Sequence, residues 1–192
     1  EMIPSSNGLL TQNLRIESDQ EFQTAIKIGK KLFDRNHEDY PGLYVLNSIL
    51  GGYFGSRLMS NIREDKGYTY NIYSEVDVMK HDGLFIIGTE VNADYADKTI
   101  AEIYKELSIL RSEPVGEEEM SMVRNYLLGR ILNFIDGPFN TGRLLKSIVL
   151  SGLKDNYFDN LIATIKNVSP EKLQVLAHRY LKEEEMMMVR VG

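Results

Sequence analysis

The segment spanning residues 50–70 constrains the fold more than any other part of this chain. It reads Leu-Gly-Gly-Tyr-Phe-Gly-Ser-Arg-Leu-Met-Ser-Asn-Ile-Arg-Glu-Asp-Lys-Gly-Tyr-Thr-Tyr. Its apolar residues recur at helical spacing: Leu58, Met59 and Ile62. This spacing predicts a short amphipathic helix over residues 56–66, ended by Gly67 and followed by a strand. Arg63 in the last helical turn and Tyr70 on the strand are therefore expected to lie close together.

The rest of the chain predicts a single α+β domain over residues 1–192. Alternating or β-branched runs predict these strands: 9–16, 23–33, 68–79, 83–91 and 186–191. Apolar residues at helical spacing predict these helices: 41–50, 94–111, 116–135, 139–151, 157–166 and 170–181. The Asp82-Gly83 pair predicts a hairpin between the third and fourth strands. We expect an antiparallel β-sheet with the helices packed mainly on one face.

Composition excludes several classes of protein. With 192 residues, 43% of them hydrophobic, the chain can bury a sizeable core. Its net charge of −6 and the lack of a basic stripe argue against a nucleic-acid partner. The absence of cysteine excludes disulfides, thiolate metal sites and cysteine nucleophiles.

No apolar run approaches the roughly 20 residues that span a bilayer, so we expect no transmembrane segment. A soluble domain is expected, with the bacterial periplasm and the cytoplasm both open as its compartment. Because the sequence starts with Glu1 instead of methionine, we also expect a piece of a longer protein.

The 50–70 segment resembles a specific stretch of a known enzyme superfamily. That stretch is the Gly-Gly-x-x-x-Ser-Arg-Leu-x-x-x-Ile-Arg-x-x-x-Gly-x-x-Tyr segment of the pitrilysin/insulinase-type zinc metallopeptidases, the inverted zincins that include mitochondrial processing peptidase. The order of strands and helices is similar along nearly the whole chain. Members use two related domains that face each other as halves of a clamshell, and this chain resembles the C-terminal half, which does not bind zinc. The resemblance implies a peptide substrate and a zinc-bearing homologous domain or subunit as partner.

The metal motif of that superfamily is missing. The motif His-x-x-Glu-His places two histidines on one helical face, whereas His37, His81 and His178 are far apart and none lies in such a motif. We expect no metal and no cofactor in this chain, with zinc on the partner domain, and we expect the isolated chain to be inactive. A non-catalytic scaffold or protein-interaction domain of the same fold is the alternative, and a homodimer of the isolated domain is a further expectation.

The resemblance implies that Arg63 and Tyr70 are catalytic and substrate-binding residues. A phenol O–H beside the attacked carbonyl and a guanidinium beside a neighbouring carbonyl would stabilise charge and hold the peptide. Strand alternation places Tyr70 on one face together with Ile72. The structural alternative is that the helix dipole favours Arg63 and that strand propensity favours Tyr70. Arg57 is expected on an exposed helix face, or paired with an acidic residue of another domain.

Overall fold

The computed structural model describes residues 13–17, 22–154 and 156–192. Its strands are β1 (Leu14–Ile16), β2 (Gln23–Leu32), β3 (Thr69–Val78), β4 (Gly83–Asn92) and β5 (Met187–Val191). Its α-helices are α1 (Tyr40–Leu50), α2 (Ala96–Ser112), α3 (Glu117–Ile135), α4 (Pro138–Ser151), α5 (Tyr157–Asn167) and α6 (Pro170–Tyr180). A π-helix, η1 (Met59–Asp65), and two short 3₁₀ turns, η2 (Ala93–Tyr95) and η3 (Glu183–Glu185), complete the order. None of the described helices is long and apolar enough to cross a membrane.

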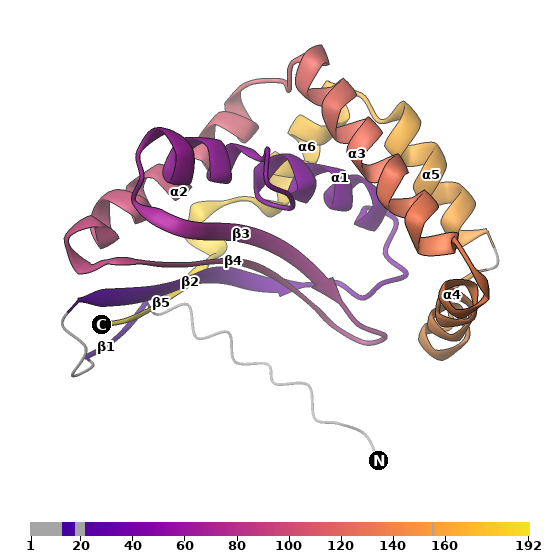
Figure 1. The fold of residues 1–192 in the computed structure, drawn as a ribbon, viewed down its shortest axis with the longest axis horizontal. Coiled ribbons are helices and arrows are strands. Elements are labelled where there is room, and N and C mark those ends of the chain that lie inside the picture. The colour runs from indigo at the N-terminus through magenta and orange to yellow at the C-terminus, as the bar shows by residue number, and fades with distance from the viewer. Residues whose placement is uncertain (1–12, 18–21, 155) are drawn as a thin grey trace.

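The strands form one sheet in the order β1-β5-β2-β4-β3 (Figure 1). β2 pairs antiparallel with β4 and β5, and β3 pairs antiparallel with β4 through the predicted hairpin. The expected α+β fold is confirmed, with one parallel pair, β1 with β5, at one edge. β1 and β2 run in opposite directions on either side of β5, so one of them has to be parallel to it. Of the strand predicted over residues 9–16, residues 9–12 lie outside the described part.

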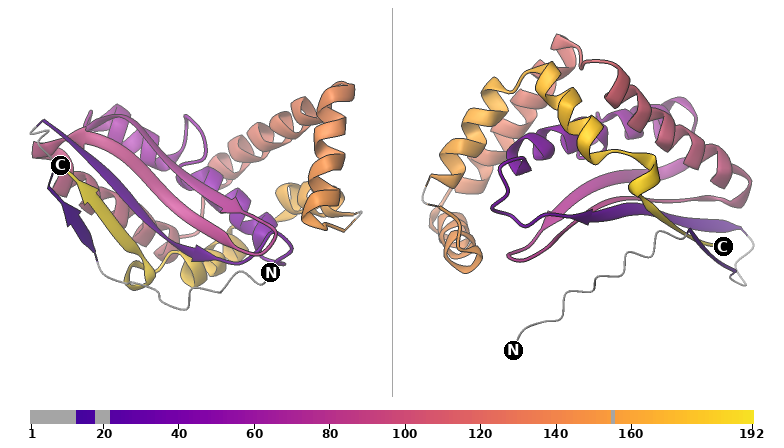
Figure 2. Two further views of the ribbon diagram at one scale, coloured as in Figure 1. Left: turned by 90° about the horizontal axis from the view of Figure 1, so that it is seen from below. Right: turned by 180° about the vertical axis from the view of Figure 1, so that it is seen from behind.

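The helices cover one face of the sheet and leave the other face open (Figures 1 and 2). Seen from below in Figure 2, the strands lie in front of the helical layer and no described helix crosses them. The strands bury one set of alternate side chains against the helices: Ile26, Ile28, Ile72, Phe85 and Ile87. Burial of this apolar face against α1, α2 and α6 holds the two layers together. As predicted, the helices pack mainly on one face.

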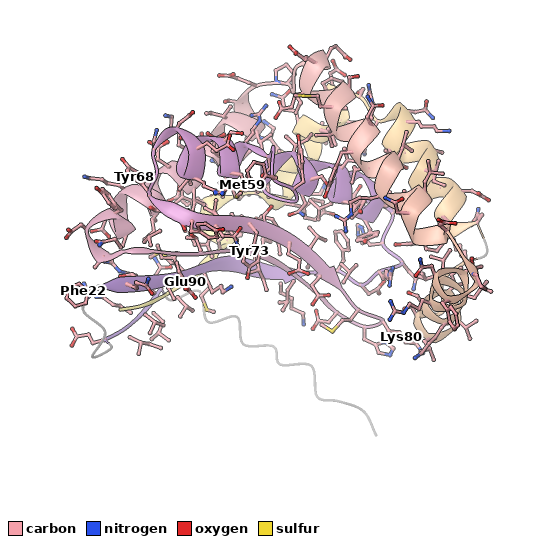
Figure 3. The ribbon with its side chains drawn as sticks, in the orientation of Figure 1. Phe22, Met59, Tyr68, Tyr73, Lys80 and Glu90 are labelled. Carbon is pink, nitrogen blue, oxygen red and sulfur yellow. The ribbon has the colours of Figure 1, made fainter. Side chains whose placement is uncertain are left out.

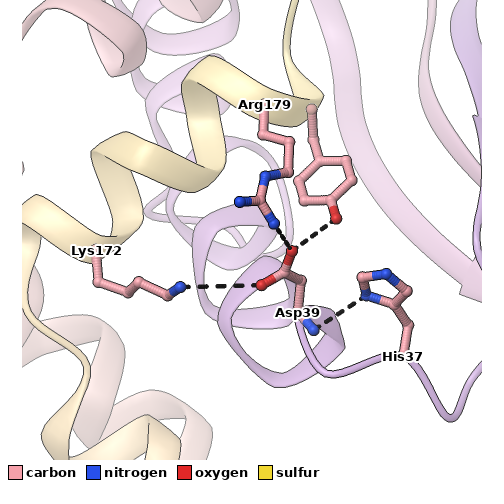
Figure 4. A network of polar contacts seen from close by, with 5 residues as sticks. His37, Asp39, Lys172 and Arg179 are labelled. Atoms are coloured by element: carbon pink, nitrogen blue, oxygen red, sulfur yellow. Dashed lines mark hydrogen bonds and ion pairs between the residues drawn. The ribbon is translucent and has the colours of Figure 1, made fainter.

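Asp39, the residue before α1, ties α6 to α1 (Figure 4). Its buried carboxylate accepts hydrogen bonds from the Tyr180 hydroxyl at 2.7 Å and from the Arg179 guanidinium at 2.5 Å, and Lys172 lies 4.0 Å away. Burial alone would raise the pKa of Asp39. The two hydrogen bonds and the nearby positive charges outweigh burial and hold this pKa below its ordinary value. Burial, followed by the bond to Asp39, raises the pKa of Tyr180 to about 12.

Replacing Asp39 with asparagine should destabilise the chain in a pH-dependent way. Because the folded-state pKa lies below the ordinary 3.8, the contribution of Asp39 is complete above that value and is lost as the pH falls through the folded-state pKa. We expect Asp39→Asn to lower the free energy of unfolding at pH 7 by about 1.5 kcal/mol, the scale of a hydrogen bond to a charged group. The difference in the free energy of unfolding between Asp39→Asn and the native chain should become smaller in acid.

Urea denaturation at neutral and acidic pH measures both effects. Asp77→Asn is the matched control, since Asp77 is exposed on β3 and forms no ion pair among the described residues. An equal loss in the free energy of unfolding for Asp39→Asn and Asp77→Asn would contradict the role assigned to Asp39.

Candidate functional site

A hollow of about 540 Å³ lies on the open face of the sheet, near the start of β3 and the end of β4. The side chains around it come from three strands: Gln23, Ala25 and Lys27 of β2, Tyr70, Asn71 and Tyr73 of β3, and Glu90 and Asn92 of β4. Figure 3 labels Tyr73 and Glu90 on neighbouring strands. One of the two predicted site residues, Tyr70, therefore lies at a concave surface.

A β-bulge sets the direction of Tyr70. Thr69 pairs with Val91 and Ile72 pairs with Thr89, so β3 has one residue more than β4 between these two pairs. Tyr70 is 87% exposed, whereas Ile72 is 1% exposed. The prediction that strand alternation places these two side chains on one face is wrong, because the extra residue of a bulge breaks the two-residue period. The bulge turns Tyr70 towards the hollow while Ile72 stays in the core.

Two threonine hydroxyls satisfy the backbone of the bulge. The Thr89 hydroxyl donates to the Asn71 carbonyl oxygen at 2.9 Å, and the Thr69 oxygen accepts the Asn71 N–H at 3.2 Å. The Thr69 hydroxyl also donates to the Glu90 carbonyl oxygen at 2.6 Å, which connects the bulge to β4. The bulge interrupts the regular ladder, so these bonds give its backbone groups partners and stabilise the irregular pairing that exposes Tyr70.

The structure brings Arg63 and Tyr70 together, as the sequence predicts. The Arg63 guanidinium carbon lies 5.3 Å from the centre of the Tyr70 ring and 4.6 Å from the centre of the Phe54 ring. Phe54, which the sequence analysis did not single out, is 61% exposed and comes from the glycine-rich loop. In the described residues no carboxylate pairs with Arg63, so two aromatic rings hold this cation in place of an acid.

This arrangement presents fixed hydrogen-bond donors to solvent. A guanidinium has five N–H donors in a rigid fork, and a cation over aromatic faces keeps those donors free for a ligand. The Tyr70 hydroxyl has no hydrogen-bond partner among the residues that the structure describes. Together the two side chains can donate to carbonyl or carboxylate oxygens.

The glycine-rich loop carries η1 to this position. A Cβ at Gly51 would lie 2.5 Å from the Ser74 nitrogen, and the Ser74 N–H donates to the Gly51 carbonyl oxygen at 3.0 Å. At the other end, Gly67 has φ of 63°, as expected for a residue that ends a helix. The predicted short helix exists, but residues 59–65 form a wider π-helix, a form that often occurs at functional sites.

Arg57, just before η1, and Asn61, within it, anchor this segment to the helical layer. Arg57 donates to both carboxylate oxygens of Glu119 at 2.9 and 2.7 Å, and the Asn61 amide donates to Glu102 at 3.0 Å and to Glu106 at 2.7 Å. The expectation that Arg57 occupies an exposed helix face is wrong, because α3 brings Glu119 to it within the same chain. Bidentate pairing of this kind fixes orientation as well as adding stability.

Lys27, Gly88 and Tyr73 form a row across the hollow that the sequence analysis missed. Lys27 and Tyr73 are the cross-strand partners of Gly88 in β2 and β3. The Lys27 ammonium donates to the Tyr73 hydroxyl and lies 4.7 Å from the centre of its ring. A Cβ at Gly88 would lie 2.6 Å from the Lys27 nitrogen, so a larger residue here would displace the ends of the Lys27 and Tyr73 side chains. The sequence signal that could have revealed this row is Gly88, an isolated glycine within a predicted strand.

Metal-ligating residues do not gather anywhere in the described part of the chain. No group of three or more histidine, cysteine, aspartate or glutamate residues could hold an ion there. His37 precedes α1, His81 lies in the β3–β4 turn and His178 is on α6. The described residues therefore do not fit a zinc ion.

Comparison with known proteins assigns the chain to a family. The family model for the peptidase M16 inactive domain matches residues 5–127. The chain belongs to the peptidase M16 inactive-domain family. The uncharacterized zinc protease YmxG of Bacillus subtilis strain 168 is 26% identical over 163 residues, which are 84% of this chain and 40% of that protein. The chain thus spans less than half the length of this relative.

Solved structures of M16 domains have the same fold. The peptidase M16 inactive domain from Pseudomonas fluorescens matches with a TM-score of 0.83 and 24% identity, over 93% of this chain and 43% of that one. The inactive peptidase domain of a putative zinc protease from Bordetella parapertussis matches with a TM-score of 0.74 and 19% identity, over 88% of this chain and 91% of that one. The latter is a chain of about the same size as this M16 domain.

Replacing the hydroxyl of Thr89 should destabilise the bulge beneath Tyr70. Thr89→Val keeps the shape of the side chain but leaves the Asn71 carbonyl without this donor, so we expect the free energy of unfolding to fall by about 1 kcal/mol. Thr99→Val is the matched control, because Thr99 is fully buried and its hydroxyl has no partner in the described structure. Denaturant unfolding should show this second change to be neutral or stabilising. A Thr89→Val variant as stable as Thr99→Val would contradict the role of the hydroxyl.

Proposed function

We propose that this domain is the half of a zinc metallopeptidase that does not bind zinc, and that its open sheet face forms part of the peptide-binding chamber. Arg63 and Tyr70 would contact the peptide, while a homologous zinc-bearing domain or subunit completes the active site. The observation that carries the proposal is the Arg63 guanidinium held against two exposed rings with no carboxylate partner in the described residues. Membership of the M16 inactive-domain family supports the same assignment.

The chemistry of peptide hydrolysis suits these donors. The reaction passes through a tetrahedral intermediate whose oxyanion is stabilised by hydrogen-bond donors already in position. The Tyr70 hydroxyl, exposed beside the hollow, would donate to this oxygen. The Arg63 guanidinium would donate to a neighbouring peptide carbonyl and fix the register of the substrate. Neither group has to change its protonation state for this role.

A non-catalytic scaffold of the same fold is the second candidate. The absence of a metal-ligand cluster among the described residues is compatible with it, since both candidates place the zinc elsewhere. The two candidates differ in what they require of Tyr70. A scaffold has no chemical need for a free hydroxyl at an exposed bulge, whereas oxyanion stabilisation depends on it.

The isolated chain should bind no zinc with useful affinity. A stable catalytic site needs about three protein ligands, and no such group exists in the described residues. Elemental analysis of protein purified without chelators should give far less than one zinc per chain. One zinc per chain, lost on replacement of any of the three histidines, would contradict the assignment of the zinc to the partner half.

Tyr70→Phe should reduce peptide turnover in the assembly that contains the zinc-bearing half. The change removes one hydroxyl and keeps the ring over Arg63, and loss of a comparable oxyanion donor lowers turnover about 10²- to 10³-fold. Arg63→Ala should also impair turnover. Turnover is measured with a fluorogenic peptide after zinc loading has been verified.

Tyr95→Phe is the matched control, because Tyr95 does not line the hollow and the change keeps its ring stacked on Tyr68, which does. This variant should retain full activity, and thermal unfolding should show all three variants to be folded. Undiminished turnover by Tyr70→Phe in the zinc-loaded assembly would make Arg63 and Tyr70 structural residues and favour the scaffold.

A further inference from the structure

A second concave surface lies in the helical layer, away from the open sheet face. It is a groove of about 270 Å³ between α4 and the body formed by α1, α3 and α5. α4 lies at one end of this layer (Figures 1 and 2), and none of its side chains is fully buried. The groove is small compared with the usual 300–1,000 Å³ of ligand pockets, which limits it to a small or slender ligand.

The lining of the groove combines apolar walls with positive charge. Tyr40 and Leu161 are buried in its walls, and Ile131, Leu144, Phe158 and Ile162 extend the apolar surface. Arg35, Arg130 and Arg143 also line it, and among the described residues no aspartate or glutamate does. The chain as a whole has 28 acidic and 22 basic residues, so a lining that carries only cations departs from the overall composition.

Arg35 and Arg130 have only neutral partners, and Arg143 has none among the described residues. Arg35 donates to the Ser147 hydroxyl at 3.0 Å and to the Tyr157 hydroxyl at 3.4 Å. Arg130 lies 3.5 Å from the Tyr126 hydroxyl. Among the residues described, no carboxylate forms an ion pair with any of the three. Positive charge beside an apolar surface is complementary to an anion that carries an apolar body.

We propose that this groove binds an aliphatic carboxylate, a medium-chain fatty acid, with its carboxylate on Arg130 and Arg143 and its chain on the apolar walls. The polar side chains of the lining decide between this ligand and a peptide terminus. Among the described lining residues they are arginine guanidinium groups, which only donate, and serine and tyrosine hydroxyls, the only side-chain groups there that can accept. The hydroxyls of Ser147 and Tyr157 already accept from Arg35, so few acceptors are left for a ligand. A peptide carries N–H donors that need acceptors, whereas a fatty acid carries none. The groove is separate from Arg63 and Tyr70, so this proposal does not depend on the proposed peptidase role.

Calorimetric titration with decanoate below its micelle concentration tests the proposal. Decanoate should bind at least tenfold more tightly than decanol, which has the same chain without the charge. R130Q/R143Q should weaken decanoate binding about tenfold or more, since hydrogen bonds to charged groups are lost. R15Q is the matched control, because Arg15 is exposed on β1 and does not line the groove. It should bind decanoate as the native chain does.

The comparison of decanoate with decanol needs no variant, and circular dichroism checks that R130Q/R143Q folds. Four results would each overturn the proposal. The first is no binding of decanoate, and the second is an equal affinity for decanoate and decanol. The third is an equal loss of decanoate affinity in R15Q and R130Q/R143Q. The fourth is tighter binding of an apolar tripeptide with a free C-terminal carboxylate than of decanoate.

Discussion

The close approach of Gly51 to the edge of the sheet is the contact on which the candidate site depends. Any side chain at this position would meet the Ser74 backbone, because a Cβ would lie 2.5 Å from its nitrogen. The Ser74 N–H donates to the Gly51 carbonyl oxygen, and the Asn47 amide donates to the Ser74 carbonyl oxygen at 3.2 Å. These bonds dock the end of α1 on β3, so the following η1 lies against the start of that strand.

Contacts from the helical layer and from the sheet then position the Arg63 guanidinium and the Tyr70 phenol. The Arg57–Glu119 pair and the Asn61 contacts orient η1 from the helical side, while the threonine hydroxyls stabilise the bulge from the sheet side. Arg63 and Tyr70 meet between these supports. Aromatic faces restrain the guanidinium without neutralising its charge, which leaves it able to bind an anionic or carbonyl oxygen.

Four arginines without a carboxylate partner among the described residues lie at or beside concave surfaces. Arg63 lies beside the hollow on the open sheet face, and Arg35, Arg130 and Arg143 line the groove under α4. Elsewhere, arginines such as Arg57 and Arg179 are paired with carboxylates. An unpaired guanidinium at a concavity keeps its full attraction for an oxygen ligand, whereas a paired one has already satisfied its charge.

Periodic patterns in the sequence determined the order of the elements, the hairpin, the covered face of the sheet and the proximity of Arg63 to Tyr70. These features follow from local signals, namely helical spacing, strand alternation, the Asp82-Gly83 turn and the stop at Gly67. Only the tertiary structure decided that Tyr70 leaves the face of Ile72, that Phe54 covers Arg63 and that Arg57 pairs with Glu119. Each of these depends on a partner from a distant or irregular segment. Local periodicity carries no information about which segments meet or where a strand gains an extra residue.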